Sequence, residues 1–210
     1  MNRPLRNGKR RAGVAIAAAI AAALMVGSAV AGNKFDYCLL CHGANANGNF
    51  GIRAPKISGM EPWYLARQLE NFAAGVRGVP ADDVGGHEMG PVGWRVKSEG
   101  TLDAVVQFIG TLESKRPAAT LGGDRARGKE IYKTCLACHG ARGEGNQALQ
   151  APALASRSDW YLATQLANYQ KGLRGADERD TYGAQMRAIA TTLADEKAIT
   201  DVVVYINTLK

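Results

Sequence analysis

Cysteine is scarce in this chain, whose 210 residues include four. All four lie in two copies of one pentapeptide, at residues 38–42 and 135–139, so none is left for a disulfide or for a thiolate metal ligand elsewhere. Strand-like alternation of polar and apolar residues is also missing over any useful length. Apolar residues recur instead at helical spacing, which predicts an all-α fold.

A strong excess of charge is also absent once the first residues are set aside. The formal net charge is +7, but all five basic residues of 1–31 are unopposed by acids, which leaves 21 basic and 19 acidic residues in 32–210. The basic residues form no cluster, which argues against a nucleic-acid partner. Because no lysine-rich docking face is visible either, we expect little long-range steering toward partners.

Residues 1–31 have the pattern of an export signal. A basic start is followed by an apolar run at 12–26 and by Ala-Val-Ala at 29–31, which predicts cleavage before Gly32 and a periplasmic protein. The alternative is an uncleaved segment, since residues 12–31 are long enough to span a bilayer. The protein would then be tethered to the inner membrane instead of moving freely in the periplasm.

The repeated pentapeptide Cys-x-x-Cys-His is the attachment signature of c-type haem. Its two cysteines can bond covalently to the vinyl groups of one haem, and the adjoining histidine can bind the iron. A zinc site or a redox Cys-x-x-Cys is the alternative, but the adjacent histidine, the duplication and the lack of further cysteine argue against both. We therefore predict two covalently bound haem c groups, with these residues: Cys38, Cys41 and His42, then Cys135, Cys138 and His139.

The two motifs belong to a longer internal repeat with a constant offset of 97 residues. Such a fixed register predicts two tandem domains of one kind. We place the first domain at 32–116 and the second at 117–210, with a linker rich in Pro and Gly at 114–123. The paired landmarks are Pro55 and Pro152, Trp63 and Trp160, Tyr64 and Tyr161, Gln68 and Gln165, Asn71 and Asn168, Arg77 and Arg174, and Met89 and Met186.

Methionine at a repeated distance points to the second iron ligand. Met89 lies 47 residues after His42, and Met186 lies 47 residues after His139. Methionine in a helical domain is often core filler, but the equal spacing favours His–Met ligation of each iron. An iron with both axial positions filled passes electrons and does not bind a substrate.

Two other candidates lack the repeat. Met60 corresponds to Arg157, so we expect it to pack in a loop and not to bind iron. His87 corresponds to Ala184 and lies two residues before Met89. We expect His87 to be a solvent-facing loop residue, although competition for the first iron stays an open alternative.

Helices are expected at five places, and a polar, Gly-rich loop is expected to lead to each methionine. The second motif follows a full helix, whereas few residues precede the first motif after cleavage. Either the first helix of the first domain is shortened, or the apolar segment is retained and runs into it. The expected helices are 61–74, 101–112, 124–134, the segment between Ser158 and Gly172, and 196–209.

These motifs, spacings and landmarks resemble class I cytochrome c, duplicated as in bacterial dihaem cytochromes of the c-four type. The resemblance covers nearly everything after residue 33 and implies two domains related by a pseudo-twofold axis. It implies that the carbonyl groups of Pro55 and Pro152 accept a hydrogen bond from the ligating histidines. It also places the following residues near the haem propionates, with simple packing or a solvated charge as alternatives: Trp63, Trp160, Arg77 and Arg174.

The sequence thus predicts a dihaem electron carrier with no substrate chemistry of its own. By resemblance, its redox partners are a quinol–cytochrome c reductase or a periplasmic dehydrogenase on one side and a terminal oxidase or reductase on the other. The alternatives are a haem enzyme (a dihaem peroxidase or a thiosulfate-oxidising cytochrome), a haem sensor, or a fixed subunit of a respiratory complex. Because the two halves differ, we expect two one-electron steps, with the more exposed first haem at the lower potential.

Overall fold

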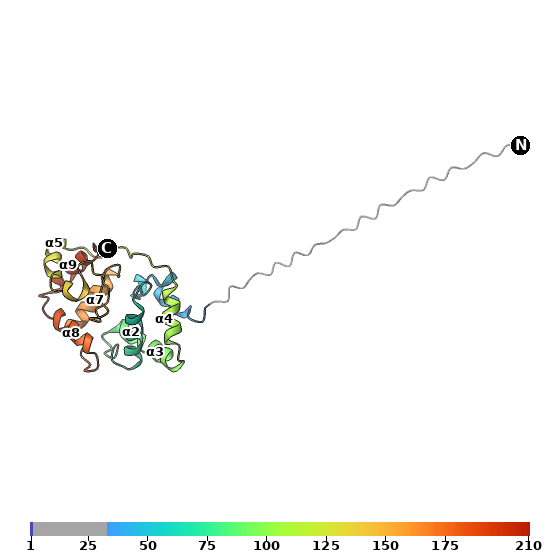
Figure 1. Ribbon diagram of the computed structural model, residues 1–210, viewed down its shortest axis with the longest axis horizontal. Coiled ribbons are helices and arrows are strands. Elements are labelled where there is room, and N and C mark those ends of the chain that lie inside the picture. The colour runs from blue at the N-terminus through green and yellow to red at the C-terminus, as the bar shows by residue number, and fades with distance from the viewer. Residues whose placement is uncertain (2–32) are drawn as a thin grey trace. The chain divides into compact units, whose positions relative to one another are not determined.

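The computed structural model describes residues 33–210, together with Met1, and this part of the chain is helical without a strand (Figure 1). The predicted export signal lies outside the described residues. No helix between residues 33 and 210 has the length and apolar character needed to cross a membrane. The elements are α1 Tyr37–His42, η1 Ala44–Ala46, η2 Phe50–Ile52, α2 Pro62–Ala73, α3 Val84–Ser98, α4 Leu102–Gly110, α5 Arg125–Tyr132, α6 Leu136–His139, α7 Asp159–Gln170, α8 Thr181–Ala190 and α9 Glu196–Ile206.

In the first half, α2 packs against both α3 and α4 (Figure 1). A Cβ on Gly93 of α3 would lie 2.7 Å from the backbone nitrogen of Ala73, so only glycine permits this close crossing. The apolar stripes of the helices meet in one core, as their spacing requires. Its buried members are Phe35, Ala46, Leu65, Leu69, Val96, Val105 and Ile109.

In the second half, α5 crosses α9, and α7 contacts both α8 and α9. The crossing of α5 and α9 depends on Gly128, because a Cβ at this position would overlap the carbonyl oxygen of Asp201. The apolar side chains of these helices form the second core. Its buried members are Tyr132, Leu162, Val202, Val203, Ile206 and Leu209.

The two methionines lie on helices, which differs from the expected loops. Met89 lies on α3 and Met186 on α8. The side chains of Asp83 and Asp180 cap these helices by accepting hydrogen bonds from Gly86 N and Gly183 N, at 3.3 and 2.9 Å. The glycines and the proline within α3 hid the helical pattern, because both residue types have low helix propensity.

The segment between the halves has no regular structure from residue 113 to 124 and is held by side-chain contacts. The carboxylate of the buried Asp159 accepts hydrogen bonds from the backbone nitrogens of Thr120 and Leu121, at 2.6 and 2.8 Å. Residues 33–210 form one compact unit. The boundary between residues 116 and 117 stays a prediction.

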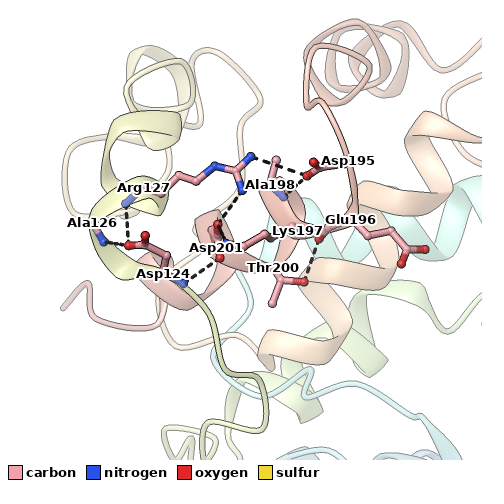
Figure 2. Close-up of polar contacts among 9 residues, drawn as sticks. All are labelled: Asp124, Ala126, Arg127, Asp195, Glu196, Lys197, Ala198, Thr200 and Asp201. Atoms are coloured by element: carbon pink, nitrogen blue, oxygen red, sulfur yellow. Dashed lines mark hydrogen bonds and ion pairs between the residues drawn. The ribbon is translucent and has the colours of Figure 1, made fainter.

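A buried carboxylate also joins α5 to α9 (Figure 2). Asp201 accepts hydrogen bonds from Lys197 Nζ at 2.8 Å, from the backbone nitrogen of Asp124 at 2.8 Å and from Arg127 Nη1 at 3.1 Å. The hydrogen bond from Lys197 lowers the pKa of Asp201, burial opposes this shift, and the Asp124 N–H and the Arg127 charge lower the pKa further. The ionised carboxylate therefore stabilises the folded state.

We expect Asp201→Asn to reduce the free energy of unfolding at pH 7 by about 1–3 kcal/mol, because the donors lose a charged acceptor. A group with a lowered folded-state pKa contributes stability above its unfolded pKa of about 3.9, and this contribution is lost as the pH falls. The difference between wild type and variant, measured by urea denaturation, should therefore shrink between pH 5 and pH 2.

Glu196→Gln is the matched control, since Glu196 is exposed on the same helix and its side chain points away from Asp201 (Figure 2). It should change stability by less than about 0.5 kcal/mol. A stability gap between wild type and Asp201→Asn that is the same at pH 7 and pH 2 would contradict the role of the carboxylate charge.

Candidate haem sites

Both motif histidines have one ring nitrogen held by the backbone. His42 Nδ1 lies 2.6 Å from the carbonyl oxygen of Pro55, and His139 Nδ1 lies 2.7 Å from that of Pro152. An Nδ1–H that donates to a carbonyl fixes the ring orientation and leaves Nε2 free to bind a metal. The two prolines thus lie where the resemblance implies, and iron ligation by the histidines stays a prediction.

The local backbone explains this geometry. Each motif ends in a short helix, after which a glycine with positive φ turns the chain, Gly43 at 75° and Gly140 at 81°. The loop then closes on itself through an antiparallel bridge, which presents the following proline to the histidine. The bridges pair Asn49 with Ala54 and Asn146 with Ala151.

Burial adjusts the protonation of the two imidazoles. His42 is 6% exposed and His139 is 4% exposed. Burial lowers the pKa of both rings, and the hydrogen bond to the proline carbonyl opposes the shift only in part. Both imidazoles are therefore neutral at pH 7, which is the form that binds metals.

Two cavities collect the motif residues, one in each half. The first cavity has Cys38, Cys41, His42 and Met89 in its wall. The second cavity repeats this set, with Cys135, Cys138, His139 and Met186. The structure thus places each methionine in the same cavity as the histidine 47 residues before it. Binding of iron by Met89 and Met186 remains a proposal.

The cavity walls carry unsatisfied donors that suit haem carboxylates. Arg77 lines the first cavity and Arg174 the second, and each is 6% exposed. In each of these side chains Nε is buried and has no hydrogen-bond partner among the described residues. Buried donors in proteins are almost always satisfied. The propionates of a haem in each cavity would supply the missing acceptors, so the residues present fit the group.

The other nitrogens of the two arginines form a reciprocal network between the halves. Arg77 donates to Gln68 at 2.7 Å and, across the boundary, to Gln165 at 2.9 Å. Arg174 donates to Gln165 at 2.9 Å and, across the boundary, to Gln68 at 3.0 Å. Arg77 also reaches Tyr161, as Arg174 reaches Tyr64. Such exchange of equivalent contacts is what a twofold relation between the halves requires.

The two glutamines and the two tyrosines of this network were repeat landmarks without an assigned role in the sequence. The structure shows that they line both cavities, together with Met60. Polar residues repeated at equivalent positions of α2 and α7, among the apolar residues of each helix, were the signal that could have identified them. The shared residues are Met60, Tyr64, Gln68, Tyr161 and Gln165.

The remaining candidates are placed asymmetrically. Trp160 lines the first cavity, which belongs to the opposite half, whereas Trp63 is half-buried and lines neither cavity. Met60 packs against the first core, as expected. His87 is exposed on α3, and its Nδ1 lies 3.3 Å from the carbonyl oxygen of Gly78.

Comparison with known proteins identifies the family. The model of the cytochrome c family matches residues 125–210. The thiosulfate dehydrogenase electron acceptor of Stutzerimonas stutzeri is 30% identical over 73% of this chain and 72% of the relative. Cytochrome c4 of Azotobacter vinelandii is 28% identical over 81% of this chain and 84% of the relative.

A solved structure of thiosulfate dehydrogenase from Marichromatium purpuratum is 29% identical, with a TM-score of 0.62 over 82% of this chain. The present chain spans 36% of that longer chain. The helical fold, the paired cavities and these similarities agree with one another. This chain therefore belongs to the cytochrome c family, as a dihaem electron-transfer cytochrome of the c4 type with one covalently bound haem c at each of its two Cys-x-x-Cys-His motifs.

Proposed function

We propose that this dihaem cytochrome takes single electrons from a periplasmic dehydrogenase, with thiosulfate dehydrogenase as the first candidate, and delivers them to a terminal oxidase or reductase. The observation that carries the proposal is the wall shared by the two cavities. Redox groups held on either side of one layer of side chains are close neighbours, which suits a protein that accepts an electron at one site and releases it from the other.

The roles of the residues follow from the same geometry. The four motif cysteines hold the haem groups, and His42 and His139 with Met89 and Met186 are the proposed iron ligands. Two ligands on each iron leave no position for a substrate. This arrangement supports a carrier over a dihaem peroxidase or a thiosulfate-oxidising enzyme.

The choice of donor rests on the relatives. One relative is named as an electron acceptor of thiosulfate dehydrogenase, and the solved structure described above is a thiosulfate dehydrogenase. A quinol–cytochrome c reductase is the alternative donor, in keeping with the similarity to cytochrome c4. We place the protein in the periplasm because of the export pattern in residues 1–31, which lie outside the described part of the chain.

Mixing the oxidised holoprotein with catalytic amounts of thiosulfate dehydrogenase and excess thiosulfate should reduce both haems. Each enzyme turnover releases electrons that need an acceptor, and two closely spaced haems can take up two of them. Stopped-flow absorbance of the haem bands measures the rate and the number of haems reduced.

One omission control and one exchange of the electron donor separate the alternatives. Thiosulfate without the dehydrogenase should leave the protein oxidised, and reduction in this control would mean that the protein oxidises thiosulfate itself. If the dehydrogenase reduces neither haem while a quinol–cytochrome c reductase reduces both, the proposed donor is wrong and the alternative holds.

A further inference from the structure

The contacts around the two proximal histidines differ between the halves, although the histidines themselves are equivalent. In the second half, the backbone nitrogen of Ala153 donates a hydrogen bond to Glu61 Oε1 at 2.5 Å. Glu61 belongs to the first half, directly before α2. This contact therefore crosses the boundary between the halves and ends one residue after Pro152.

The peptide group between Pro152 and Ala153 joins this carboxylate to the second histidine. Its carbonyl oxygen accepts the hydrogen bond from His139 Nδ1 at 2.7 Å, and its N–H donates to Glu61. A charged acceptor on the N–H polarises the peptide group and makes its carbonyl oxygen a stronger acceptor. A stronger acceptor on Nδ1–H makes the imidazole a more basic ligand.

The carboxylate is held in this position from the second half. The Arg157 guanidinium donates to the carbonyl oxygen of Gly59 at 2.5 Å, and the same nitrogen lies 3.8 Å from Glu61 Oε2. The Arg157 side chain is 7% exposed and that of Glu61 24%, so solvent screens the pair only in part. Burial lowers the pKa of His139, while the Pro152 carbonyl and the Glu61 charge both oppose that shift.

The first half lacks this carboxylate. The corresponding peptide group joins Pro55 to Lys56, and within residues 33–210 the N–H of Lys56 has no side-chain acceptor. The repeat places Ser158 at the position of Glu61. Lys56 itself is buried, and its Nζ donates to the carbonyl oxygen of Ser156 at 3.1 Å. The proximal peptide group of the first haem thus has no carboxylate on its N–H among the described residues, and the Lys56 ammonium group lies across the boundary, at Ser156 of the second half.

We infer that Glu61 tunes the second haem iron from across the boundary, through the peptide group between Pro152 and Ala153. A more basic histidine favours the oxidised iron, and the Glu61 charge offsets that of Arg157 in the wall of the second cavity, so the second haem has the lower reduction potential. This order is opposite to the one expected from the shortened first helix. The inference rests on the proposed ligation by His139, and Glu61 acts as a positioning residue that touches neither iron nor haem.

Glu61→Gln tests the inference, because the amide oxygen can still accept the hydrogen bond from Ala153 while the charge is lost. The equilibrium constant for reduction of the second haem should rise about tenfold, which is roughly 59 mV for a one-electron couple. The reduction potential of the first haem should change much less. Glu61→Ser introduces the residue found at the equivalent position 158. It should raise the reduction potential of the second haem at least as much as Glu61→Gln does.

A redox titration followed by NMR assigns each step to a haem. The amide signals of Leu40 and Leu136, one inside each motif, lose their paramagnetic shifts as the adjacent iron is reduced. In the wild type, we expect the Leu40 signal to change first and the Leu136 signal second. The amide proton of Ala153 should also move upfield in Glu61→Gln, because its acceptor is no longer charged.

The matched control is Glu70→Gln, which removes one negative charge from the exposed surface of α2. The inference would be overturned if the reduction potential of the second haem is unchanged in Glu61→Gln, or if Glu70→Gln shifts that potential by the same amount. Reduction of the second haem before the first in the wild type would also overturn it, even if the variants fail to fold. These titrations need no partner protein, so their outcome does not depend on whether the proposed electron donor is correct.

Discussion

Replacing Met89 or Met186 with alanine is expected to open one iron each to carbon monoxide and to remove half of the sulfur-to-iron charge-transfer absorbance. Each methionine lies in the same cavity as one motif histidine, half-buried on α3 or α8. Loss of the thioether leaves an axial position free, and a small ligand can then bind the reduced iron. Visible spectra of the ferric protein, and of the ferrous protein with and without carbon monoxide, measure both effects.

Met60→Ala is the control for these variants. Met60 lines both cavities, but it packs against the first core and corresponds to Arg157 in the repeat. Because Met60 is only half-buried, its loss should lower stability by about 0.5–3 kcal/mol without opening either iron. If Met60→Ala removes the charge-transfer band and Met89→Ala does not, the ligand choice based on the repeat is wrong. Binding of carbon monoxide to the wild type would contradict it equally.

Gly128→Ala is expected to destabilise the second half by about 3 kcal/mol or more, because overpacking at a backbone contact cannot be relieved by rotating a side chain. The new Cβ would overlap the carbonyl oxygen of Asp201 on α9. The helices would have to separate, and Val202 and Ile206 of α9 line the second cavity. The midpoint of chemical denaturation, followed by the absorbance of the second haem, should therefore move to a much lower denaturant concentration.

Gly110→Ala is the matched control, since no atom outside its own helix lies within 4 Å of a Cβ at this position. Alanine has a higher helix propensity than glycine, so stability should stay the same or rise by about 0.5–1 kcal/mol. If Gly128→Ala lowers the free energy of unfolding no more than an ordinary surface substitution does, the two helices are not in close contact in solution.

The haem motifs and the repeat were readable in the sequence because both are local or periodic. The Cys-x-x-Cys-His motif places three groups on one short helix, so its chemistry needs no tertiary information. The constant offset of 97 residues showed that the halves are equivalent, and the repeated spacing selected Met89 and Met186 over Met60. The helices with clear apolar stripes, such as α2 and α9, were predicted to within about three residues of their observed ends.

The helices that carry the methionines were missed for a physical reason. Within α3, Gly86 leaves room for the Asp83 carboxylate and Gly93 leaves room for the backbone of α2. Pro91 also lies inside the helix. Propensity alone predicts a loop for such a segment. Tertiary packing against α2 overrides that preference and cannot be seen in the local sequence, whereas the cap at Asp83 was a local signal that the glycines and the proline outweighed.

The sequence by itself determined the haem attachment, the helical class and the duplication, since each depends on residues close together or on a constant spacing. Only the tertiary structure decided how the equivalent residues are used. Arg77 and Arg174 reach across the boundary to equivalent partners, whereas Glu61 contacts Ala153 with no equivalent contact in the other direction among the described residues. Contacts between residues about 90 positions apart follow from how the halves pack, and a repeat in the sequence cannot show where that packing breaks the symmetry.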